Sequence, residues 1–338
     1  MKEGACLEKQ LKDKVFGALK ALALPVCVFL IIVVLTKGRF GTSTSILSLL
    51  RTTVLPILIG MSMSFGMSMG MWNFSTGAVI YAAAIFGAQV ANHFEMGIPG
   101  VCLFTILFAV LMNVFTGFLY NKLRVPCLVL SLGMVMVYEA LPALLTVERG
   151  GAIKLTDGYL AASPWCYLIL IIAYAIFYYI NNYTTLGADM RAIGANIVIS
   201  NNAGLNIDRV KFVSFLISGV FMGVAAILYL STNITVKAVF GFQSVSVIFD
   251  GMMGIFVAGV LTKYIHYDFA FLIGIFTIRM LGSGLVAMGL PSEIRSVMTG
   301  VFLFIVLTYS ANSGLMERRK QKKVTSEAAN AEYAKMQS

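Results

Sequence analysis

A few polar side chains interrupt the long apolar runs of this sequence, and their chemistry could serve a small polar solute. Amide, hydroxyl and carboxylate groups form hydrogen bonds readily, but in an apolar environment each is costly unless it has a partner or faces water. The candidates for lining a solute pathway are Asn73, Ser75, Thr76, Asn113 and Asp250. Two alternatives stay open: a salt bridge from Asp250 to Arg279, and hydrogen bonds between helices for Asn113 and Glu139.

A second chemical feature is a polar loop, residues 186–211, which separates two apolar runs and reads LGADMRAIGANIVISNNAGLNIDRVK. Asn196 can accept hydrogen bonds from the free N–H groups of a following helical turn. Gly204 suits the left-handed position that ends a helix. A helix of about two turns is therefore expected between them, and propensity alone does not hold so short a helix in water.

Docking against a partner surface would stabilise this short helix, because it begins with three consecutive apolar residues, Ile197, Val198 and Ile199. Polar side chains that could anchor such a contact flank it: Arg191, Asp208, Arg209 and Lys211. The structural alternative is a loop that folds back onto the chain's own helices.

The motifs of catalysis and metal binding that we sought are missing from the sequence. It contains no Gly-Lys dipeptide, so it has no phosphate-binding GxxxxGK loop and cannot hydrolyse ATP by that route. Its two histidines lack HExxH spacing, and its five cysteines form no CxxC pair. We therefore expect no catalytic residue, no metal site and no cofactor, and a protein that is not an enzyme.

The elements that must position these residues are membrane helices. Hydrophobic residues make up 59% of the chain and charged residues 12%, with a mean hydropathy of +0.88. Such a composition predicts an all-α polytopic membrane protein. About ten apolar segments are long enough to cross a bilayer: 15–36, 46–68, 74–91, 98–120, 126–146, 164–181, 210–231, 243–262, 269–288 and 293–311. They form one transmembrane domain, 15–311, between a cytoplasmic tail at 1–14 and a basic cytoplasmic tail at 312–338.

Basic residues predict the orientation, because cytoplasmic flanks retain Lys and Arg. With the N-terminus inside, ten spans place most of the 25 basic residues on one side, including those of both tails. Both termini are therefore expected in the cytoplasm. The net charge of +10 is then a topology signal and a source of contact with anionic lipid, and gives no reason to invoke nucleic acid.

The polar loop resembles a loop of known transporters. Residues 191–196 read RAIGAN, residues 203–211 read AGLNIDRVK, and Ser218-Gly219 follows in the next span. This pattern is similar to the cytoplasmic loop of the permeases of ribose and simple-sugar ABC transporters, to which nucleoside and branched-chain amino acid permeases are related. In that family the loop carries the short coupling helix that sits in a groove of the ATPase subunit. The resemblance assigns ATPase coupling to Arg191, Asn196, Ile197, Ile199, Gly204, Asp208 and Arg209.

The resemblance is softer elsewhere in residues 45–311. Residues 71–78, MWNFSTGA, resemble a glycine-flanked Asp-Leu-Ser-Xaa-Gly element of the family, with Asn73 where the family often has aspartate. Residues 250–254, DGMMG, stand where the family usually has a Gly-Gly pair. Glycine-interrupted segments near 60–77 and 241–259 are therefore expected to be broken helices in two pseudo-repeated halves around a central solute site.

The resemblance implies the permease subunit of an ATP-binding-cassette importer in the plasma membrane, for a small polar solute such as a sugar or a nucleoside. Its implied partners are a second permease subunit, identical or related, cytoplasmic ATP-binding subunits and an extracytoplasmic substrate-binding protein. The alternative is an ion-coupled secondary transporter of the inverted-repeat type. That class needs intramembrane ion ligands such as paired carboxylates, and the spans offer few beyond Asp250 and Glu139.

Overall fold

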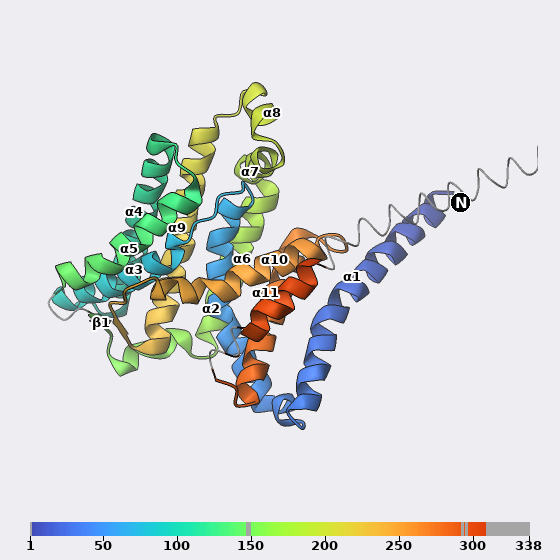
Figure 1. The fold of residues 1–338 in the computed structure, drawn as a ribbon, viewed down its shortest axis with the longest axis horizontal. Coiled ribbons are helices and arrows are strands. Elements are labelled where there is room, and N and C mark those ends of the chain that lie inside the picture. Colours follow the sequence, from blue (N-terminus) through green and yellow to red (C-terminus); the bar gives the residue numbers. More distant parts are fainter. Residues whose placement is uncertain (1, 147–149, 292–293, 295–296, 309–338) are drawn as a thin grey trace, which may run out of the picture.

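The computed structural model describes residues 2–146, 150–291, 294 and 297–308, and it shows a bundle of long helices (Figure 1). The predicted tail at 312–338 lies outside the described residues. The α-helices are α1 Lys2–Leu35, α2 Ser43–Met67, α3 Ser75–His93, α4 Gly97–Leu123, α5 Cys127–Leu145, α6 Trp165–Tyr183, α7 Thr185–Ala195, α8 Ile197–Asn202, α9 Ile207–Asn233, α10 Phe249–Leu261 and α11 Tyr267–Ala287.

Short elements complete the connections between these helices. They are the 3-10 helices η1 Arg39–Gly41, η2 Leu155–Ala161 and η3 Gln243–Ile248, and the strands β1 Gly150–Ala152 and β2 Thr235–Lys237. The strands pair antiparallel, with Gly150 opposite Lys237. This pair ties the α5–α6 connection to the α9–α10 connection at the same end of the bundle.

Within the described residues, seven helical segments are long and apolar enough to cross a membrane. Two further apolar helices, Leu19–Leu35 and Val297–Thr308, are shorter. The third expected span, α3, is not among the seven. The structure therefore confirms an all-α, multi-pass membrane protein, while the count of ten spans and the two pseudo-repeated halves stay predictions.

Helix α3 lies at the centre of the bundle, packed against α4, α5 and α9. Most of its side chains are small and fully buried, including Ala82, Ala83 and Ala84. Small residues allow helix backbones to approach closely within a membrane. At Gly87 the approach is so close that a methyl group would collide with Thr105 of α4. This packing holds the polar start of α3, at Ser75 and Thr76, inside the protein.

Both glycine-interrupted segments contain a helix break, and each break holds a glycine in the left-handed region: Gly70, with a φ of 74°, and Gly241, with a φ of 70°. α2 is continuous through Gly60 to Met67, and the irregular segment is residues 68–74. α10 is continuous through Gly251 and Gly254, and the irregular segment before it is residues 238–242, followed by η3.

Close packing explains why these glycines belong to continuous helices. A methyl group at Gly60 would come within 2.6 Å of Ile275 Cδ1, and one at Gly251 within 3.0 Å of the Gly60 backbone nitrogen. The glycines thus serve the contact of α2, α10 and α11 rather than the breaks.

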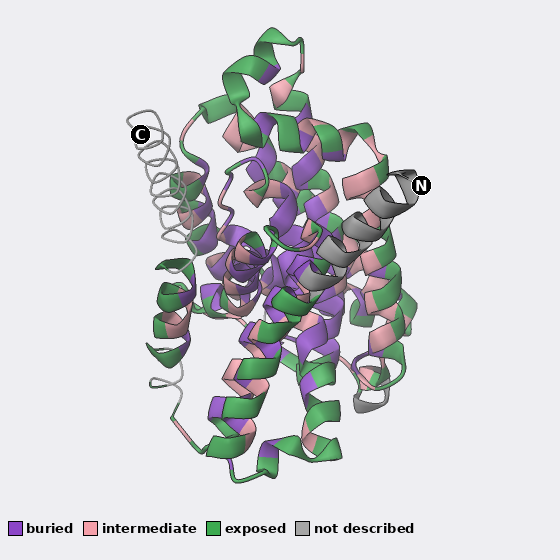
Figure 2. Ribbon diagram, turned by 90° about the vertical axis from the view of Figure 1, so that its right-hand side faces the viewer, coloured by how far each residue is buried: buried purple, intermediate pink, exposed green. Residues whose placement is uncertain are grey.

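The two ends of the bundle carry different elements. α8 projects from one end, and the α1–α2 connection lies at the opposite end in both views (Figures 1 and 2). Asn121 Nδ2, next to Lys122, donates to the Asp208 carbonyl oxygen at 2.8 Å, so Lys122 lies at the α8 end.

We expect this polarity to be visible by labelling. Single cysteines at Lys154 and Lys237 should react with a membrane-impermeant thiol reagent added outside intact cells, because both positions belong to the end that the basic residues assign to the exterior. Cysteines at Lys122 and Lys263 should react only after the membrane is permeabilised. The measurement is labelling before and after permeabilisation, and reversal at any one of the four positions would contradict the ten-span orientation.

Candidate coupling loop and solute pathway

The short helix predicted in the polar loop is present as α8, and its caps are the predicted ones. The Asn196 side-chain oxygen accepts hydrogen bonds from the backbone N–H groups of Val198 at 3.0 Å and Ile199 at 3.1 Å. Gly204 has a φ of 84°, in the left-handed region, and the next N–H group, that of Leu205, donates to the Ser200 carbonyl at 3.1 Å. Local hydrogen bonds therefore define both ends of α8.

The apolar side chains at the start of α8 face away from the chain's own helices. Ile197, Val198 and Ile199 are 46%, 64% and 65% exposed. The helix lies at the tip of the molecule (Figure 2). Three consecutive exposed aliphatic residues on a projecting helix are typical of a contact surface. The alternative in which these residues fold back onto the bundle is not the arrangement observed.

A cleft of about 480 Å³ lies beside α8, between the end of α4 and the start of α9. Asp208 lines the cleft and is exposed, as is the adjacent Arg209, and Asn206 caps α9 by accepting from the Arg209 N–H at 3.0 Å. The residues that line the cleft include Tyr120, Asn121, Arg124, Ile197, Asp208 and Lys211. The apolar tip of α8 and the charged start of α9 thus belong to one continuous surface.

Helix α7 connects α8 to the rest of the bundle at two places. At Gly194 its backbone meets the Ser68 carbonyl so closely that no side chain would fit. Ser68 begins the irregular segment between α2 and α3. At the second place, the Arg191 guanidinium donates to the Asn181 carbonyl at the end of α6. Movement of α7 would therefore act directly on the first helix break and on the end of α6.

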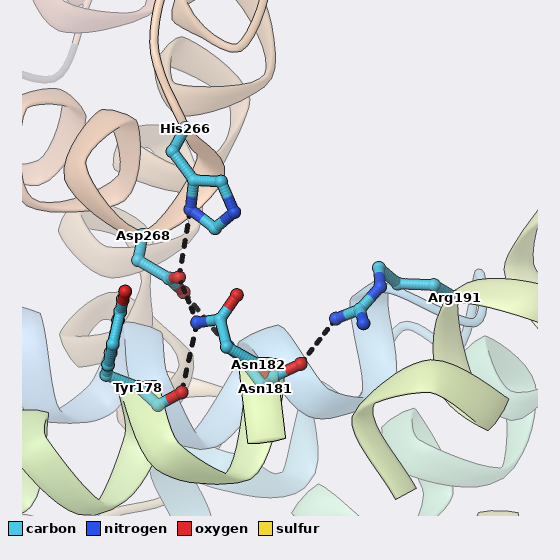
Figure 3. A network of polar contacts seen from close by, with 6 residues as sticks. All are labelled: Tyr178, Asn181, Asn182, Arg191, His266 and Asp268. Carbon is cyan, nitrogen blue, oxygen red and sulfur yellow. Dashed lines mark hydrogen bonds and ion pairs between the residues drawn. The ribbon is translucent and has the colours of Figure 1, made fainter. Parts of the chain in front are cut away.

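A polar network joins the end of α6 to the start of α11 (Figure 3). The Asp268 carboxylate, 1% exposed, accepts from Asn182 Nδ2 at 2.6 Å and Asn181 Nδ2 at 3.3 Å. His266 Nδ1 lies 3.1 Å from the same carboxylate. We did not anticipate this network from the sequence. The available signal was an asparagine pair ending one apolar run and an acid starting another.

Four of the five predicted pathway residues lie together at the first break, fully hydrogen-bonded. Asn73 donates through Nδ2 to Asn113 Oδ1 at 3.1 Å, and its own Oδ1 accepts from the Ser75 hydroxyl at 2.6 Å. The Thr76 hydroxyl donates to the Asn73 carbonyl at 3.0 Å, and Asn113 Nδ2 donates to the Phe215 carbonyl at 2.5 Å. All four side chains are at most 7% exposed.

The cavity beside this network is small. A cavity of about 10 Å³ touches Asn73 and is lined in part by Ser62, Ser214 and Ser218. That is room for about one water molecule. The four residues therefore hold the helices together in this conformation, as the helix-to-helix alternative for Asn113 foresaw, and their role in a solute pathway stays a prediction.

The second break is held by Glu139 of α5. This carboxylate is 3% exposed and accepts from the backbone N–H groups of Phe242 at 3.0 Å and Ser244 at 2.9 Å. The chain here is left-handed at Gly241 and Phe242, which turns both N–H groups toward Glu139. Ser244 in turn packs against Gly77 at the start of α3. The two breaks therefore meet inside the bundle.

Asp250 is placed apart from that hydrogen-bonded group. It accepts from Arg279 Nη1 at 2.8 Å, and the two side chains are 36% and 31% exposed. The alternative proposed for Asp250 is therefore the contact observed. A paired but accessible carboxylate at membrane depth remains available to a polar pathway.

Replacing Asp250 with Asn should lower the midpoint of thermal unfolding, because it weakens a charged hydrogen bond worth about 2 kcal/mol. Adding Arg279→Gln should restore part of the lost thermal stability, since no arginine is then left without a carboxylate partner. The measurement is a thermal melt of the four combinations, with the exposed Asp208→Asn as control. Strictly additive losses would show that the observed pair contributes no coupling energy.

The fold is thus that of a multi-pass helical membrane protein with an exposed, capped helix at one end. Comparison with known proteins gives the family. A family model described as the branched-chain amino acid transport system permease component matches residues 45–307, so the chain belongs to this family of ABC transporter permeases. This confirms the resemblance stated from the sequence. Members are channel subunits and not enzymes themselves.

Individual relatives are distant but cover much of the chain. It is 26% identical over 301 residues to the autoinducer 2 import system permease protein LsrC of Photorhabdus laumondii, with 86% of this chain and 87% of the relative covered. It is 27% identical over 209 residues to the probable ABC transporter permease protein YphD of Escherichia coli, covering 59% of this chain and 61% of that relative. It is 24% identical over 285 residues to the galactofuranose transporter permease protein YtfT of E. coli, covering 81% of each.

Proposed function

We propose that this chain is the membrane-spanning subunit of an ATP-driven importer for a small polar solute, with a sugar or a nucleoside as the favoured class. The observation that carries the proposal is α8, a capped helix that exposes Ile197, Val198 and Ile199 at one end of the bundle. Relatives named for autoinducer 2, ribose and galactofuranose support the solute class.

The proposal includes the partners of the complex. Cytoplasmic ATP-binding subunits bind α8 and the adjoining cleft. A second permease subunit, identical or related, completes the membrane domain, and an extracytoplasmic substrate-binding protein delivers the solute. The plasma membrane holds the complex with both termini of this chain in the cytoplasm.

The coupling mechanism follows from the contacts of α7. Closure of the ATP-binding subunits pushes α8, and α7 moves with it. The Gly194–Ser68 contact carries the displacement to the segment before α3, while Arg191, Asn181 and Asp268 carry it to α11. Because the breaks before α3 and α10 meet at Gly77 and Ser244, a shift at one side changes both. Solute access then alternates between outside and inside.

Gly204→Val should abolish binding of the ATP-binding subunit without disturbing the membrane helices. Its φ of 84° is disfavoured for a β-branched residue, and nothing lies within 4 Å of an added methyl group, so the effect is confined to the backbone at the end of α8. Gly204→Asn is the matched control, because asparagine tolerates the left-handed region.

The measurement is co-purification of the proposed ATP-binding subunit, together with the ATPase rate. Normal binding and a normal ATPase rate with Gly204→Val would remove α8 from the proposed contact. Equal loss with both variants would show that side-chain bulk, and not backbone conformation, is responsible.

A further inference from the structure

Three of the charged side chains deep within the membrane spans are linked by one cavity and one salt bridge. In the seven described spans, the charges more than about one and a half turns from a span end are Arg51, Glu139, Asp250 and Arg279. Glu139 is buried on backbone N–H groups, whereas the other three are exposed or partly exposed. An arginine that faced lipid at this depth would be costly, so these three side chains face water or a partner.

Arg51 and Arg279 line one cavity of about 260 Å³ between α2, α6, α9 and α11. Ser48, Thr52 and Thr232 line it as well. The hydroxyls of Thr52 and Thr232 donate to backbone carbonyls of their own helices, so toward a ligand their oxygens can act as acceptors. Arg51 is eight residues from the start of α2 and Arg279 eight from the end of α11, so each lies about 12 Å inside the span. η2 closes one wall through Ala161, which places the cavity in the half of the bundle predicted to face the exterior.

The hydrogen bonds at this cavity leave positive charge and donors unused. Arg51 Nε donates to the Ala161 carbonyl at 2.9 Å, and among the described residues no salt bridge joins Arg51 to a carboxylate. Arg279 bonds Asp250 through Nη1, but its Nε is buried and has no partner within the described part of the chain. Apolar side chains such as Val54 and Leu228 form much of the lining, so the two guanidinium groups are its charged members. Asp250 pairs with Arg279 but does not line the cavity, and one carboxylate against two guanidinium groups leaves a net positive charge there.

We propose that this cavity binds an anionic group, a carboxylate or a phosphate, carried by the transported solute. A guanidinium presents paired donors that match the oxygens of either anion, and hydroxyl groups beside it suit a polyhydroxylated remainder. Since Asp250 stands in the first turn of α10, an anion on Arg279 competes with Asp250 and loosens the start of that helix. This inference rests on the proposed importer function and names the chemistry of its solute.

The test measures the electrostatic potential of the cavity and its occupancy by an anion directly. The permease, purified with its proposed partner subunits in nanodiscs of neutral phosphatidylcholine, carries Thr52→Cys with its native cysteines replaced by alanine. Methanethiosulfonate reagents bearing a sulfonate or a trimethylammonium group compete for the introduced thiol. At each position the rate with the sulfonate reagent is divided by the rate with the trimethylammonium reagent. This ratio should be about tenfold higher at Thr52→Cys than at Lys154→Cys, which lies outside the cavity. Adding Arg51→Gln should remove most of that preference.

Ligand protection then identifies the anion. D-glucuronate and glucose 6-phosphate are compared with D-glucose at equal concentration. At least one of the two acids should lower the reaction rate at the introduced thiol by at least about twofold, the effect of half occupancy, and glucose should not. Equal protection by glucose, or protection by none of the three, would overturn the assignment of an anionic solute.

Two further outcomes would also overturn it. If neither reagent reacts, the cavity is covered by lipid chains or by the second subunit. If phosphatidylglycerol in the nanodisc removes the sulfonate preference without added solute, the anionic group belongs to a lipid headgroup. None of these measurements needs ATP, so the two proposals can fail separately. If the preference for the sulfonate reagent is absent but ATP-driven uptake is intact, only this inference is overturned. If the sulfonate preference is present but no ATP-binding subunit binds, only the proposed function is overturned.

Discussion

Replacing Ile197 and Ile199 together with aspartate is expected to abolish ATP-driven uptake while the membrane domain stays folded. The two side chains are 46% and 65% exposed, so their loss should change the free energy of unfolding by less than about 0.5 kcal/mol. In the complex they would occupy the apolar part of the contact with the ATP-binding subunit. Placing a charge at each such position costs about 2 kcal/mol of binding free energy, which together weakens binding on the order of a thousandfold.

The measurement compares uptake, ATPase rate and co-purification of the ATP-binding subunit for the double variant and for Ala188→Asp. Ala188 is exposed on α7, outside α8, and adds the same kind of charge near the loop. The double variant should lose all three properties, and Ala188→Asp should keep them. If both variants lose uptake equally, any negative charge added near the loop weakens binding of the ATP-binding subunit, and the effect is not specific to α8. Wild-type uptake by the double variant would show that α8 is a passive loop.

Glu139→Ala is expected to have the largest effect on stability of any single substitution considered for this chain. It would leave the N–H groups of Phe242 and Ser244 without an acceptor inside the bundle. Each unsatisfied buried donor costs about 1–3 kcal/mol, so the total is about 4 kcal/mol. The segment before α10 would then lose its fixed path, and its contact with Gly77 of α3 would loosen.

Thermal melts and the yield of folded protein measure this effect. Glu139→Gln should be intermediate, because an NH2 group, which can only donate, replaces one of the two oxygens that accept these N–H groups. Glu95→Gln is the control, since Glu95 is an exposed acid at the α3–α4 turn. A melt of Glu139→Ala that matches the wild type would mean that the second break does not depend on this carboxylate.

Local signals in the sequence were sufficient to predict α8. Its two ends depend on Asn196 and Gly204, whose preferences act within a single turn, and both take the predicted conformations. The same reasoning expected breaks near 60–77 and 241–259, and the irregular residues 68–74 and 238–242 lie within or overlap those segments. It could not separate the glycines of the breaks, Gly70 and Gly241, from Gly60 and Gly251, which lie at close helix contacts. Only the approach of α2, α10 and α11 decides between the two.

Long-range partners explain the residues that sequence reasoning missed or left open. Asn182 and Asp268 are 86 positions apart, and Glu139 and Ser244 are 105 apart. No periodicity within a span encodes such pairs. The Asp250–Arg279 pair, 29 positions apart on adjacent helices, was foreseen as an alternative because opposite charges at membrane depth have few other partners.

The central claim is that this chain moves its solute only when a separate subunit hydrolyses ATP. The most direct test is uptake into proteoliposomes that contain the purified chain, with and without the proposed ATP-binding subunit. The solute is first identified by screening compounds against the proposed substrate-binding protein. We predict accumulation only when the ATP-binding subunit, the binding protein and ATP are all present. Accumulation by the chain alone, driven by a sodium or proton gradient, would contradict the claim and establish the ion-coupled secondary transporter instead.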